Sequence, residues 1–123
     1  MIEKTKLLNF DNLAFHKHPS CSDGIMAQLN MGDFTISVVA NILQGDGLYG
    51  RVEMCRETEQ LDYLNGDYEV AMWRRGDSDM IPLGVGDDVL ARQTPAQVSK
   101  HMRDAQLNGS AWVDLLRKLR KDF

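Results

Sequence analysis

Two segments in the middle of the chain alternate between apolar and polar residues. Residues 34–38 and 67–74 follow the two-residue period of a strand that buries one face. The apolar positions on that face are Phe34, Ile36, Val38, Tyr68, Val70 and Met72. We predict that these segments are the central strands of a sheet.

Three further segments are predicted to extend this sheet. Residues 12–18 and 25–31 have strand length, and the turn-forming run PSCSDG between them predicts a hairpin or a looped strand pair. Residues 80–83 follow the turn GDSD and are expected to form a hairpin with residues 67–74. Pro82 has no backbone N–H to donate, so this strand is predicted to lie at an exposed edge.

The last third of the chain carries helix signals. Thr94, Pro95 and Gln97 supply a hydroxyl cap, a proline at the first helical position and a glutamine that closes the capping box. The helix is expected to end near Leu107, because the following Asn-Gly pair favours a left-handed stop.

Ser110 is expected to cap a second helix that has an apolar stripe at spacings of three and four. The stripe consists of Trp112, Leu115, Leu116, Leu119 and Phe123. It must cover either the sheet or a second subunit, so a homodimer through the Trp112 helix is one expected arrangement. The opposite face carries Arg117, Lys118, Arg120 and Lys121, whose charges complement the helix dipole.

These elements together predict one α+β domain over residues 1–123. An antiparallel sheet from the N-terminal two-thirds is expected to pack against the two C-terminal helices.

The composition narrows the class of protein. With 43% hydrophobic and 26% charged residues, the chain has the make-up of an ordinary globular protein. A net charge of -4 argues against a general affinity for nucleic acid. No apolar run reaches about 18 residues and the N-terminus has no signal-peptide core, so we expect a cytoplasmic protein without a membrane span. The two cysteines are expected to be free thiols.

Residues 44–66 are interpreted as a long, acidic and partly ordered connection. Positions 45 to 69 hold seven acids and two bases. Long loops and unpaired strand edges are common docking surfaces. The residues predicted to contact a partner protein are therefore Glu57, Glu59 and Asp62 in the connection and Pro82 at the edge.

Residues 45–50 read GDGLYG, which fits the dinucleotide-binding pattern. The ligand-binding residues in this alternative are Gly45, Gly47, Gly50 and Glu69, the last about 20 residues after the glycines. Such a site needs a helix directly after the glycines, so that its N-terminus meets the phosphates. Residues 51–64 show no coherent apolar stripe, which favours a glycine-rich loop between strands.

His16, His18 and Cys21 are ligand types that zinc accepts, but a structural site needs four ligands and Cys55 stands alone. We therefore predict no metal site and no cofactor, and a metal-dependent hydrolase using the two histidines is a weaker hypothesis. The acids Asp77, Asp79, Asp87 and Asp88 and the base His101 have no nucleophile in a recognisable setting. No catalytic residue is predicted, and the protein is expected not to be an enzyme.

The order of the segments FHKHPS, GIMAQLNMGDFTISVV, GLYG, YEVAMW, LGVGDDVL and TPAQV resembles a family of small tailed-bacteriophage proteins without an established function. The resemblance runs from Phe15 to about Met102, and residues 51–66 look like an insertion relative to it. It implies a phage gene product in the cytoplasm of the infected bacterium and transfers no catalytic residue.

The leading hypothesis is a non-enzymatic phage accessory protein that binds and blocks a host or defence protein. The alternative is a module that sequesters a small ligand or nucleotide at the glycine loop.

Overall fold

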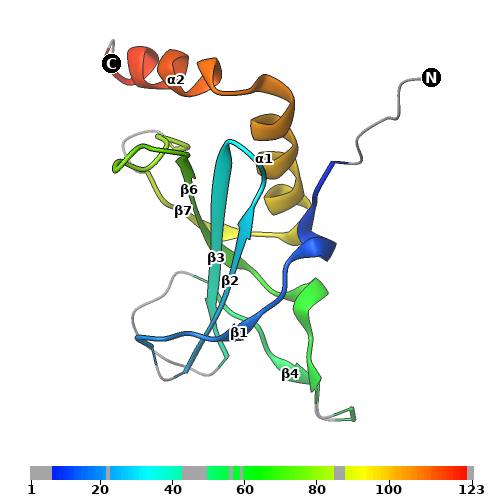
Figure 1. Ribbon diagram of the computed structural model, residues 1–123. Helices are drawn as coiled ribbons and strands as arrows, with labels where there is room; N and C mark the ends of the chain where they lie inside the picture. The colour runs from blue at the N-terminus through cyan, green and yellow to red at the C-terminus, as the bar shows by residue number, and fades with distance from the viewer. Residues whose placement is uncertain are drawn as a thin grey trace, which may run out of the picture.

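A five-stranded antiparallel sheet forms the centre of the computed structural model (Figure 1). The structure describes residues 7–21, 23–42, 50–55, 57–58, 60–84 and 88–121. In spatial order the strands are β1 (His16–Lys17), β2 (Gly24–Asn30), β3 (Phe34–Asn41), β6 (Tyr68–Arg74) and β7 (Leu90–Gln93).

The predicted central strands are confirmed. β3 and β6 pair in a register that places Ile36 opposite Met72 and Val38 opposite Val70. All four side chains are fully buried on the face that the first C-terminal helix covers. The two-residue period of the sequence therefore selects the buried face of the sheet, as expected for a half-buried strand.

The N-terminal hairpin is shorter than predicted. Of residues 12–18, His16 and Lys17 form the strand that pairs with β2, and the His18 N–H donates to the Gly24 carbonyl at 2.9 Å. The chain before them forms a 3₁₀ turn, η1 (Phe10–Asn12). The Asn12 side chain accepts from the Asn9 N–H and the Asn9 side chain accepts from the Asp11 N–H, and these two hydrogen bonds hold the turn. Local side-chain to backbone hydrogen bonds therefore replace a ladder over this segment.

The prediction of a strand over residues 80–83 is wrong. Only Met80 forms a bridge, with Trp73, and the Ile81 N–H donates to the Met72 carbonyl at 2.8 Å. Ile81 is fully buried and Pro82 is also buried, so this segment turns into the core and offers no exposed edge. Beyond the bridge, β7 occupies the edge of the sheet, and the sequence pattern did not indicate it.

Both predicted helices are confirmed. α1 (Pro95–Asn108) begins at the Thr94–Gln97 capping box and ends at Gly109, whose φ of 73° suits a residue without a Cβ. α1 buries Val98, Met102 and Ala105 against the sheet, whereas α2 (Ala111–Lys121) buries Val113. Figure 1 shows α1 lying along one face of the sheet and α2 crossing beyond its end. The fold is α+β, as the sequence predicts.

The acidic connection contains a small hairpin of its own. β4 (Met54–Cys55) pairs with β5 (Gln60–Leu61), and a 3₁₀ turn, η2 (Tyr63–Asn65), leads back to β6. Val52 is fully buried and anchors the hairpin to the core. The hairpin projects from the end of the sheet opposite α2 (Figure 1).

In the part of the chain that the structure describes, neither helix has the length and apolar character needed to cross a bilayer.

Candidate interaction surface

A shallow groove of about 260 Å³ lies between the η1 and η2 segments, which are far apart in the sequence. Its lining residues are Phe10, Asp11, Leu13, Phe15, Tyr63 and Leu64. Five of these six side chains are apolar or aromatic, and the sixth is a carboxylate. The groove therefore combines an apolar surface with negative charge.

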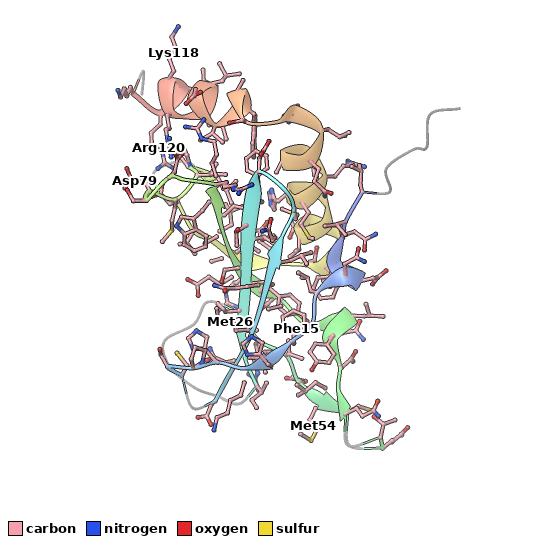
Figure 2. The ribbon with its side chains drawn as sticks, in the orientation of Figure 1. Phe15, Met26, Met54, Asp79, Lys118 and Arg120 are labelled. Atoms are coloured by element: carbon pink, nitrogen blue, oxygen red, sulfur yellow. The ribbon has the colours of Figure 1, made fainter. Side chains whose placement is uncertain are left out.

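Stacked aromatic rings build the floor of the groove. The rings of Phe15 and Tyr63 stack with centroids 5.2 Å apart, and Phe10 and Tyr68 pack behind them at 5.1 Å from each other. Figure 2 shows Phe15 pointing toward the η2 segment. Aromatic pairs at these spacings add to the stability that burial provides.

Hydrogen bonds fix both walls. The buried Tyr68 hydroxyl donates to the Tyr63 carbonyl at 2.6 Å, and burial raises the pKa of Tyr68 above its usual range. On the other wall, the Phe10 N–H donates to the Ser99 hydroxyl on α1 at 3.0 Å, and the Asp11 N–H donates to the Asn9 side chain at 2.9 Å. The groove is therefore a preformed feature of the fold.

The groove has acidic surroundings. Residues 9–15 and 57–67 contain no lysine or arginine. No ion pair within the described residues involves Asp11, Glu57 or Asp62, although Asp62 accepts a hydrogen bond from Asn65 at 2.8 Å. These carboxylates are available to a positively charged partner.

Two large apolar side chains are exposed in the same region. Leu64, at the groove, is 69% exposed, and Met54, on the hairpin, is 57% exposed. Figure 2 shows Met54 at the projecting end of the molecule. We call the groove, together with Met54, Glu57 and Asp62, the acidic hairpin surface.

The turn of the hairpin also perturbs a thiol. Hydrogen bonds from the side chain and backbone of Thr58, and from the backbone of Glu57, lower the pKa of Cys55 below its usual value. These contacts tie the β4 end to the turn.

The structure brings together only part of the predicted partner-binding set. Glu57 and Asp62 lie on the acidic hairpin surface, whereas Glu59 lies outside the described residues. Pro82 is buried and does not line the groove. Sequence reasoning missed Phe10, Leu13, Phe15 and Leu64, because no local pattern shows that η1 and η2 meet.

The described residues that follow Gly50 do not form the helix that the glycine-loop alternative needs. Gly45 and Gly47 lie outside the described residues, and the chain after Gly50 is extended, with Arg51 bridging Asn41 and Asp67. A Cβ on Gly50 would lie 2.7 Å from the Asp67 carbonyl oxygen and from the Tyr68 Cα, so close backbone packing explains this glycine. Glu69 lies within β6, opposite Val39.

The histidines make local contacts. The Nδ1 atom of His18 accepts from the Ser20 and Cys21 N–H groups at 3.0 and 3.1 Å, whereas His16 Nδ1 contacts the Lys17 carbonyl at 2.9 Å. Across the described ranges, no three side chains from His, Cys, Asp or Glu come close enough to hold a metal ion.

Two of the acids considered for hydrolysis, Asp77 and Asp88, form ion pairs with arginines of α2. Asp77 accepts from Arg74 at 2.9 Å and pairs with Arg117 at 3.0 Å, and Asp88 pairs with Arg120. Burial opposes the ionisation of Asp77, but the two arginines outweigh it and lower its pKa. Figure 2 shows Arg120 pointing toward the loop that carries Asp79, whereas Lys118 points away from the molecule. Two members of the basic face therefore have a structural role.

His101 lies in the helix–sheet packing. Its Nε2 atom lies 2.8 Å from the Gln93 side-chain oxygen, and burial lowers its pKa. Asp87 lies outside the described residues.

The predicted stripe of α2 is only partly covered. Trp112 packs edge-on against Phe34 with ring centroids 6.3 Å apart, and Val113 beside it is buried. Leu115 and Leu119 are 53% and 46% exposed, and Phe123 lies outside the described residues. A homodimer through this helix stays a prediction.

A larger depression of about 450 Å³ lies where the N-terminal segment crosses α1. The backbone of Leu8 exchanges two hydrogen bonds of 2.8 Å with the Gln106 side chain there, and Lys100 pairs with Asp104 at 3.0 Å. The depression therefore results from the packing of the N-terminal segment on α1, which these hydrogen bonds fix.

Comparison of the chain with protein-family models, curated proteins and solved structures gave no match.

Proposed function

We propose that the chain is a non-enzymatic phage accessory protein that binds and blocks a host or defence protein in the cytoplasm of the infected bacterium. The acidic hairpin surface is the contact region. The observation that carries the proposal is the exposure of Leu64 and Met54 beside carboxylates that have no ion-pair partner in the described chain.

This surface has the composition of a protein interface. Removing a leucine or methionine side chain from water contributes about 1.5–3 kcal/mol, so two such side chains favour association. Carboxylates at the rim of an apolar patch add specificity and speed the encounter with a partner of opposite charge.

The shape suits blockade. The hairpin extends from the end of the sheet, so it can enter a recess of a partner while the rest of the domain covers the surrounding surface (Figure 1). Inhibition by this route needs no reactive group.

Affinity capture from bacterial lysate tests the proposal. The bait proteins are the wild type, Leu64→Ser, the double variant Glu57→Lys with Asp62→Lys, and Leu107→Ser as a matched control, because Leu107 on α1 is 65% exposed. We expect the wild type and Leu107→Ser to retain one protein at near-stoichiometric yield, and the other two to lose it.

Two results would contradict the proposal. Capture of no specific protein by the wild type would refute a binding function, and equal capture by all four baits would refute the assigned surface.

A further inference from the structure

We propose that the groove between η1 and η2 receives one large apolar side chain from a partner protein, with a lysine or arginine within two positions of it. This inference rests on the proposed function and specifies the chemistry of its partner. It assigns the groove as the anchor point within the acidic hairpin surface.

The size of the groove indicates one side chain. Small-molecule sites enclose roughly 300–1,000 Å³, and the groove, at about 260 Å³, is below that range and shallow. Its aromatic floor offers ring faces to an aliphatic or aromatic group. Interface anchors are typically single large side chains that fill a preformed pocket of this kind.

The charges around the groove indicate the neighbouring residue of the partner. Asp11 lines the groove, and Asp62 directly precedes Tyr63, another lining residue. In an extended segment, residues one or two positions apart are separated by roughly 3–7 Å, so a basic side chain next to the anchor can reach a carboxylate. An acidic segment or a nucleic acid would be repelled.

A second copy of this chain is the competing occupant. Leu119 on α2 is 46% exposed and stands between Lys118 and Arg120 in the sequence. However, Figure 1 shows α2 beyond the end of the sheet and the η1 and η2 turns beside the sheet and the lower part of α1, so such a contact would join two different surfaces of the domain. Closed symmetric contacts are the rule for soluble homo-oligomers, which favours a different protein as the occupant.

Selection from a random-peptide display library on the purified protein tests the inference. We expect enriched peptides to share a large apolar residue with lysine or arginine within two positions. Binding of these peptides should weaken about fivefold in the Asp11→Asn and Asp62→Asn double variant, as expected for the loss of two exposed ion pairs. Leu64→Ser should weaken it about tenfold.

Matched controls are Asp33→Asn, an exposed acid in the β2–β3 turn, and Leu107→Ser. Both should leave peptide binding unchanged. Retained thermal unfolding midpoints would show that the groove variants are folded.

Four results would overturn the inference. These are the absence of enrichment, enriched peptides without the basic residue, binding that the groove variants do not change, and self-association in sedimentation that Leu64→Ser abolishes. The last result would identify a second copy as the occupant. Capture from lysate judges the proposed function separately, because a host protein can bind the hairpin without using the groove.

Discussion

The Tyr68 hydroxyl connects the core to the wall of the groove, so its removal tests the packing argument. Tyr68→Phe keeps the ring but deletes the 2.6 Å hydrogen bond to the Tyr63 carbonyl. The net loss for one such bond is about 1 kcal/mol, and the Tyr63 carbonyl keeps a second partner, the Gly66 N–H at 3.3 Å. We expect Tyr68→Phe to lower the free energy of unfolding at neutral pH by about 1–1.5 kcal/mol.

The same substitution should alter the pH dependence of stability. Burial raises the pKa of Tyr68 in the folded state, so the folded protein keeps the phenol proton at a pH where the unfolded chain, with a pKa of about 10, releases it. The stabilisation is complete below about pH 10 and is lost above it, at about 1.4 kcal/mol per pH unit. Tyr68→Phe has no phenol at this position and does not lose this stabilisation. The difference in free energy of unfolding between the wild type and Tyr68→Phe should therefore be about 1.4 kcal/mol smaller at about pH 11 than at neutral pH.

Urea unfolding of both proteins at neutral pH and at about pH 11 measures these quantities. Tyr63→Phe is the control, because the Tyr63 ring is only partly buried and its hydroxyl makes no hydrogen bond within the described residues. Equal stabilities of Tyr68→Phe and the wild type at neutral pH, or a deficit independent of pH, would refute the reasoning.

Three further predictions concern other parts of the fold. Thr58→Val should raise the pKa of Cys55 and slow its alkylation by iodoacetamide at neutral pH, because it deletes the hydrogen bond that lowers this pKa most; an unchanged rate would contradict that role. Gly50→Ala should reduce the free energy of unfolding in urea by about 1–3 kcal/mol, because its Cβ would meet backbone atoms at 2.7 Å; a fully stable variant would show that the chain can yield there. Asp77→Asn should be less stable than the wild type near pH 7, and the difference should disappear as pH falls below about 4, because ion pairing lowers the folded-state pKa of Asp77 and its stabilisation is lost on protonation. Thermal unfolding across that pH range would show a constant difference if these pairs contributed nothing.

The ion pairs of Asp77 also explain how α2 is held. The sequence places four basic residues on one face of this helix and suggests a solvated surface. The structure uses Arg117 and Arg120 to join α2 to the segment between β6 and β7. Charge at that face therefore secures the helix while leaving Leu115 and Leu119 half exposed.

The sequence by itself determined the elements whose signals are local. The alternation of residues 34–38 and 67–74 sets the buried face of β3 and β6, because successive strand residues point to opposite sides. The Thr94–Gln97 capping box and Gly109 set the ends of α1, because capping involves residues within one turn. These interactions need no information from distant parts of the chain.

Only the tertiary structure decided the edges and the surface. β7 takes its place by pairing with β6, and both Ile81 and Pro82 are buried where the sequence predicted an exposed edge. The groove exists because Phe15 meets Tyr63, two residues that no periodicity connects. Contacts of this kind depend on how the whole chain packs, which is why the sequence indicated Glu57 and Asp62 but not the aromatic groove beside them.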